Sequence, residues 1–158
     1  MEQKRIRLKY FKDRLPKKLK KLGMKVEDLK GCTKAEIDEL QSFFELKFPQ
    51  SYIEFLELMG ESAGGIMAGS SIFTDEIRNL GKWSEELLAE DNSNLNLPPN
   101  SFVFWMHQGY QFAFFYINQH DNPVVHYYLE GSNFFENTSL LFTEFILMQF
   151  PNLSLIHI

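Results

Sequence analysis

The chain of 158 residues contains four histidines, the side chains best suited to acid–base catalysis or metal binding near neutral pH: His107, His120, His126 and His157. None of them lies in a Gly-x-Ser-x-Gly or His-Glu-x-x-His motif, which would orient a nucleophile or hold zinc. His120 and His126 with Asp121 come nearest to a metal-ligand set, but they span a predicted turn and strand without a fixed ligand spacing. We therefore expect turn and surface roles for the histidines, and no catalytic residue, metal or cofactor.

A glycine-rich stretch at residues 60–69 is a second feature with chemical potential, because glycine-rich loops can bind phosphate groups. A phosphate-binding loop also needs a Lys-Ser or Lys-Thr pair, which this stretch lacks. It also follows a predicted helix. The sequence therefore predicts a turn here and no nucleotide binding.

Three pairs of adjacent carboxylates lie on one segment: Asp75-Glu76, Glu85-Glu86 and Glu90-Asp91. The same segment has apolar residues at spacings that predict one or two short helices, namely Ile72, Ile77, Leu80, Trp83, Leu87 and Leu88. Adjacent side chains point in different directions on a helix, so a catalytic carboxylate pair is not expected. The charges are either an ordinary solvated face or a patch that contacts a basic partner, with Trp83 or Trp105 as the aromatic anchor of such an interface.

Two helices and the corner between them are predicted in residues 33–59. Thr33 and Glu36 form a capping box, so the first helix should begin at Lys34 and bury an apolar stripe that extends as far as Phe48. Pro49 ends that helix and starts the next one, because proline is tolerated at a helix start but not inside a helix.

The second helix should bury one apolar stripe, made of Tyr52, Phe55, Leu56 and Met59. Gly60, Gly64 and Gly65 follow, and glycine adopts positive φ at little cost. A tight turn that leads into the rest of the fold is therefore expected.

The second half of the chain predicts an antiparallel meander followed by a helix. Aromatic and β-branched runs at 102–106 and 111–117 flank a turn with Gly109, and a third strand covers 124–129. Helical spacing returns at 141–150, where Pro151 should end the last helix. Both faces of the strands are apolar, so helices on one face alone would leave aromatic residues exposed. Either a partner or the flanking segments must cover the second face.

Charge divides the chain into a basic arm and an acidic body. Residues 1–30 carry 12 Lys or Arg and 4 Asp or Glu, whereas residues 31–158 carry 4 and 17. An acidic surface attracts cationic partners and accelerates their encounter, although acidic surfaces also serve plain solubility.

The basic arm, with Leu15, Leu19 and Leu22 at helical spacing, has three possible uses: binding nucleic acid, lying on an anionic membrane, or folding back on the acidic body. Folding back is favoured, because aromatic residues for base stacking are limited to Tyr10 and Phe11. Cys32 is the single cysteine, and no apolar run resembles a signal peptide or membrane span. These features predict a cytoplasmic protein.

The order of these elements resembles the SUKH superfamily, which includes many bacterial immunity proteins and a fungal regulator of cell-wall synthesis. The match involves the first helix (Thr33, Glu36, Ile37, Leu40), the Pro-x-x-Tyr-x-x-Phe-Leu helix (Pro49, Tyr52, Phe55, Leu56) and the glycine turn (Gly64, Gly65). It departs at Ala63, where the family more often has asparagine. The resemblance implies a single α+β domain, with an antiparallel meander sheet flanked by an N-terminal helical pair and a C-terminal helix.

We therefore expect a basic helical extension over residues 1–30 and a SUKH-like domain over residues 31–158. The resemblance implies an immunity protein that neutralises a basic protein toxin, such as a nuclease, by stoichiometric binding and without catalysis. Nucleic-acid and membrane binding are not expected. The alternative is a cytoplasmic adaptor or regulator that is not linked to a toxin.

Overall fold

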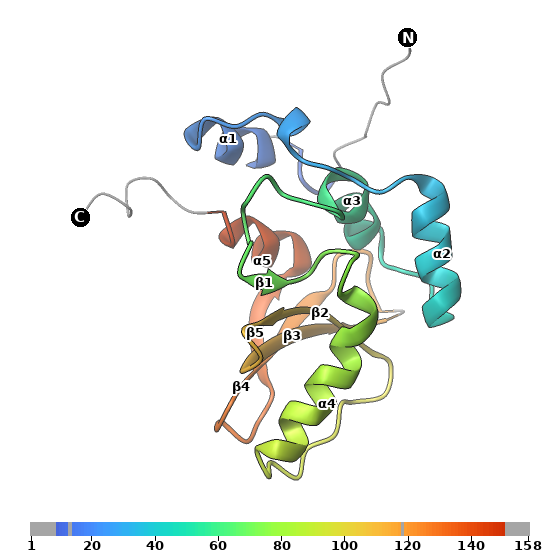
Figure 1. Cartoon of the computed structure of the whole chain (residues 1–158), viewed down its shortest axis with the longest axis vertical. Coiled ribbons are helices and arrows are strands. Elements are labelled where there is room, and N and C mark those ends of the chain that lie inside the picture. Colours follow the sequence, from blue (N-terminus) through green and yellow to red (C-terminus); the bar gives the residue numbers. More distant parts are fainter. Residues whose placement is uncertain (1–8, 13, 118, 151–158) are drawn as a thin grey trace, which may run out of the picture.

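The computed structural model describes residues 9–12, 14–117 and 119–150, which form one α+β domain (Figure 1). Its helices are α1 (Arg14–Lys21), α2 (Lys34–Phe44), α3 (Gln50–Met59), α4 (Leu80–Glu90) and α5 (Phe142–Met148), with 3-10 turns η1 (Val26–Asp28) and η2 (Ile77–Asn79). Its strands are β1 (Ser70–Ser71), β2 (Ser101–His107), β3 (Gln111–Tyr116), β4 (Val124–Leu129) and β5 (Glu136–Leu141). No helix among the described residues is long and apolar enough to span a bilayer.

The capping box is formed as predicted. The Thr33 hydroxyl accepts a hydrogen bond from the backbone N–H of Glu36, and the Glu36 carboxylate accepts one from the backbone N–H of Thr33. Helix α2 therefore begins at Lys34. The predicted end of this helix was wrong: α2 stops at Phe44, because Glu45 adopts the left-handed conformation with φ of 54°. Phe48 therefore lies in the connection between the helices, and Pro49 is the N-cap of α3.

The glycine turn after α3 is confirmed at two of its three positions. Gly64 and Gly65 have φ of 62° and 97°, whereas Gly60 has an ordinary helical φ of −60°. Gly60 is required for space instead, since a Cβ there would lie 2.5 Å from the Sγ atom of Cys32. The turn carries the chain from α3 toward β1, at one edge of the sheet.

The sheet is an antiparallel meander in the order β1-β2-β3-β4-β5. The predicted hairpin and third strand are present, and Gly109 has the expected positive φ of 78°. The sequence missed both edge strands, because β1 has only two residues and β5 (ENTSLL) is mostly polar, without an alternating apolar pattern. The last helix also ends earlier than predicted, at Met148, and Pro151 lies outside the described residues.

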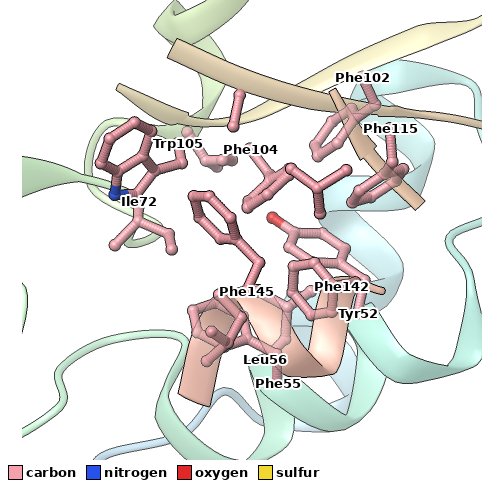
Figure 2. Close-up of a cluster of buried hydrophobic side chains, with 14 of the residues drawn as sticks. Tyr52, Phe55, Leu56, Ile72, Phe102, Phe104, Trp105, Phe115, Phe142 and Phe145 are labelled. Atoms are coloured by element: carbon pink, nitrogen blue, oxygen red, sulfur yellow. The ribbon is translucent and has the colours of Figure 1, made fainter. Parts of the chain in front are cut away.

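A β-bulge in β2 determines which aromatic residues share a face. Cross-strand pairing shifts between Val103 and Trp105, so Phe104 and Trp105 both reach the face covered by α3 and α5. Phe104 lies 5.0 Å from Phe142 and Trp105 lies 5.4 Å from Phe145, measured between ring centroids (Figure 2). The bulge therefore adds an aromatic residue to this core.

The second face of the sheet is covered by the chain itself. Phe112 and Phe114, on β3, are fully buried, and their rings contact Phe135. Met106, which pairs with Phe112, lines a groove together with Leu87 of α4, and α4 contacts β2. Segments of the chain that flank the sheet thus cover the aromatic residues on its second face.

The described part of the basic arm, residues 9–12 and 14–30, folds back on the body through buried apolar side chains and one carboxylate. Phe11, Leu15 and Leu19 are fully buried in the same core as the rest of the chain, and α1 contacts α5. Glu54 of α3 is only 5% exposed, and its carboxylate accepts the backbone N–H groups of residues 9–11, the one of Phe11 at 2.9 Å. The domain boundary at residue 30 remains a prediction based on charge.

We expect Glu54→Ala to lower the free energy of unfolding by about 2 kcal/mol, because it leaves buried N–H donors without an acceptor. Urea denaturation measures this loss. Trypsin should also cleave the α1 lysines faster in the variant, since the anchor of the arm is removed.

Glu57→Ala is the matched control, on the same helix. Its carboxylate makes no hydrogen bond or ion pair among the described residues. Equal stability and equal cleavage rates for the two variants would show that Glu54 does not anchor the arm.

Candidate protein-binding site

Helix α4 presents an acidic outer surface and a buried apolar stripe. Its exposed residues include Glu85, Glu86 and Glu90, whereas Leu80, Leu87 and Leu88 are buried in the core. The segment thus has the helical character predicted for it. Figure 1 shows that α4 runs away from the end of the molecule that carries α1.

A groove of about 380 Å³ lies between α4 and the edge of the sheet. Trp83, Glu86 and Glu90 form its helical side, at the spacing that places residues on one face of a helix. The other side comes from distant parts of the chain, namely Gly69, Ser71, Met106, Gln108 and Gly109. The result is a half-buried tryptophan flanked by two exposed carboxylates.

The direction of α4 strengthens the negative potential at this site. The C-terminal end of a helix carries a partial negative charge, and α4 has no basic residue in its last turn. Glu90 lies at that end, although a carboxylate there is unfavourable for the helix. None of the ion pairs among the described residues involves Glu85, Glu86 or Glu90. Lys82 is the one basic residue of α4, so the outer surface of this helix carries a net negative charge.

Asp91, at the end of α4, has a structural contact that the sequence did not reveal. Its carboxylate accepts hydrogen bonds from the hydroxyl of Tyr128 on β4 and from the backbone N–H of Gly131, the second at 2.6 Å. These two bonds hold the pKa of Asp91 below its ordinary value, while burial and the bond to Asp91 raise the pKa of Tyr128 to about 12. Asp91 thus links the end of α4 to β4.

The other predicted contact residues are scattered. Asp75 is exposed and Glu76 half-buried, and both lie just before η2 without lining the groove. Glu85 is exposed on α4, also outside the groove. Trp105 is only 6% exposed and packs on Phe145, so a partner would reach it only by opening the core. Of the two tryptophans, Trp83 is the one that is half-buried and lines the groove.

None of the histidines in the described part of the chain lines the α4 groove, although His107 lies next to Gly69 at its edge. His126 packs against Phe114 and Tyr116, and burial lowers its pKa. His120 lines an open polar depression on another part of the surface. The Nδ1 atom of His107 forms a hydrogen bond with the Ser70 hydroxyl at 3.0 Å. Among the described residues, no cluster of three His, Cys, Asp or Glu could hold a metal; His157 lies outside them.

We expect Asp91→Asn to flatten the acid limb of the stability profile. Because the folded-state pKa of Asp91 is depressed, its contribution is present above the ordinary carboxylate pKa and is lost as pH falls through the folded value. Chemical denaturation between neutral pH and about pH 2 measures the difference between the variant and the parent protein.

Tyr128→Phe is the companion variant, because it removes the donor and keeps the aromatic ring. The pKa of Asp91, followed by NMR of its carboxyl carbon, should rise in Tyr128→Phe. An unchanged Asp91 titration in that variant would assign the depressed pKa to another group.

The chain matches a known family model over most of its length. The family model described as SMI1 / KNR4 family (SUKH-1) matches residues 31–147, which include α2 to α4, every strand and all but the last residue of α5. The chain has no significant match among curated proteins or among solved structures. Because the family model covers most of the chain, and the fold contains the capped helix, the proline corner and the meander, the protein belongs to the SMI1 / KNR4 (SUKH-1) family.

Proposed function

We propose that this protein is an immunity protein, which binds a cognate basic protein toxin one to one and blocks the toxin's active site or substrate channel. The observation that carries the proposal is Trp83 at the α4 groove, with Glu86 and Glu90 beside it. A half-buried aromatic anchor beside exposed carboxylates is the arrangement expected for docking on a cationic surface. Membership of the family supports a protein-binding role.

The charge of the site supports a cationic toxin as the partner. Nuclease toxins are one such class, because a protein that holds phosphate groups needs basic residues at its active site. An acidic surface at the end of α4 would compete for those basic residues by charge and would accelerate the encounter. The proposed location is the cytoplasm, where an immunity protein meets an incoming toxin. Binding alone neutralises the toxin, so the proposed function requires no catalytic residue.

Site-specific photo-crosslinking tests the proposal directly. With p-benzoyl-phenylalanine at Glu86, we expect the protein to crosslink in its source cells to a toxin-like protein at a ratio of one to one. The same group at Asp38, exposed on α2, is the control. Crosslinks only to housekeeping proteins would favour the adaptor alternative. Crosslinks to a toxin at Asp38, and none at Glu86, would move the interface away from α4.

We also expect Glu86→Lys with Glu90→Lys to slow association with the captured toxin by about ten-fold and to weaken its salt dependence, because steering depends on the charge near the interface. Stopped-flow fluorescence or surface plasmon resonance measures the association rate and its dependence on salt.

Glu27→Lys with Glu39→Lys is the matched control, since both residues are exposed and the change in net charge is identical. Equal effects of the two pairs would show that overall charge, and not the α4 surface, governs association.

A further inference from the structure

A second groove, of about 460 Å³, lies between α1 and α5. Its two walls differ in chemistry. The α1 wall consists of the four cations Arg14, Lys17, Lys18 and Lys21, whereas the other wall is mainly aliphatic and consists of Leu140, Leu147, Met148 and one carboxylate, Glu144. Met148 is 63% exposed and Leu140 is half-buried, so these two side chains are open to a ligand, whereas Leu147 belongs to the core. The groove thus combines an apolar surface with a row of positive charges.

The positive charges in the groove are not neutralised within the described part of the chain. None of the ion pairs there involves Arg14, Lys17, Lys18 or Lys21. The Glu144 carboxylate accepts the backbone N–H of Leu141 at 2.9 Å, as part of the cap of α5. Like charges at neighbouring positions on a helix repel one another, so an anionic ligand would relieve this repulsion. Charge complementarity therefore requires a ligand with several carboxylates or phosphates.

Several sources of negative charge fit the groove poorly. A membrane would require an apolar face to insert, but Leu15 and Leu19 of α1 are fully buried in the core. Single-stranded nucleic acid gains affinity by base stacking, and no aromatic side chain lines this groove. Residues 151–158, which follow α5, contain no Asp or Glu. The acidic α4 of a second copy has its own leucines in the core, so it offers no apolar residues to the aliphatic wall.

We propose that the α1–α5 groove binds an acidic amphipathic helix of a partner protein. Leucine-like side chains of that helix pack on Leu140 and Met148, and its carboxylates pair with Lys17 and Lys21. The flexible thioether of Met148 adapts to different apolar side chains. This surface is separate from the α4 site, since α1 and α4 lie toward opposite ends of the molecule in Figure 1. The chain would thus hold an acidic partner and a basic one at the same time.

The test uses the full chain and a fluorescein-labelled peptide of Leu, Glu and Ala, with leucines at i, i+3, i+4 and i+7 spacing on one face and glutamates on the other. Fluorescence anisotropy at low salt and in about 0.3 M NaCl measures its affinity. We expect saturable binding that weakens with salt. A peptide with every Glu replaced by Gln, and a scrambled one with the same composition, should each bind at least about ten-fold more weakly.

Two pairs of variants locate the binding. Lys17→Glu with Lys21→Glu should weaken it at least about ten-fold, whereas Lys12→Glu with Lys20→Glu, which makes the same change in net charge at exposed residues outside the groove, should have a much smaller effect. Met148→Ser should also weaken binding, and Phe134→Ser, at another exposed apolar residue, should not. Circular dichroism and thermal unfolding check that each variant is folded.

Several results would overturn the proposal. Failure of the parent protein to bind the acidic peptide would do so, as would equal losses in both lysine pairs. Stronger binding of single-stranded DNA or phosphatidylserine vesicles through Lys17 and Lys21 would assign the groove to those ligands instead. Concentration-dependent self-association that is abolished by Lys17→Glu with Lys21→Glu would assign it to a second copy of the chain.

Discussion

Both faces of the central sheet are apolar, and the positions of the helices follow from the need to cover both. Phe102, Phe104 and Phe115 face α3 and α5, whereas Phe112 and Phe114 face the side on which α4 lies. Tyr52 is fully buried and contacts the rings of Phe102, Phe115 and Phe142, so α3, β2, β3 and α5 meet at one residue. Truncation of such an aromatic residue usually costs about 3–5 kcal/mol.

The same constraint separates the charges on the surface. Helices α1 and α4 each use their leucines to cover the core, so each helix presents a mainly polar face to the solvent. The polar face of α1 is basic and that of α4 is acidic. The two helices lie toward opposite ends of the molecule (Figure 1), which keeps the charges from neutralising each other. The domain thus has two surfaces of opposite charge.

Prediction from the sequence succeeded for features that depend on neighbouring residues. The capping box at Thr33, the proline corner at Pro49 and the turn at Gly109 each need only a few residues, and all three are formed. It was less successful for the candidate site. The sequence offered Trp83 and Trp105 equally as the aromatic anchor of an interface. Trp105 lies in the core, however, because a bulge in β2 turns it toward Phe145. Asp91 was grouped with a contact patch, but it bonds Tyr128, which is distant in the sequence.

The sequence by itself determined the α+β fold class, the helix starts, the central hairpin and the division into a basic arm and an acidic body, because local backbone preferences and composition are properties of short segments. Only the tertiary structure decided that α4 covers the second face of the sheet, that Glu54 anchors the arm, and that two grooves open beside α4 and α1. Those features depend on contacts between residues far apart in the chain. Such contacts leave no periodic pattern, because they are selected by the packing of the whole core.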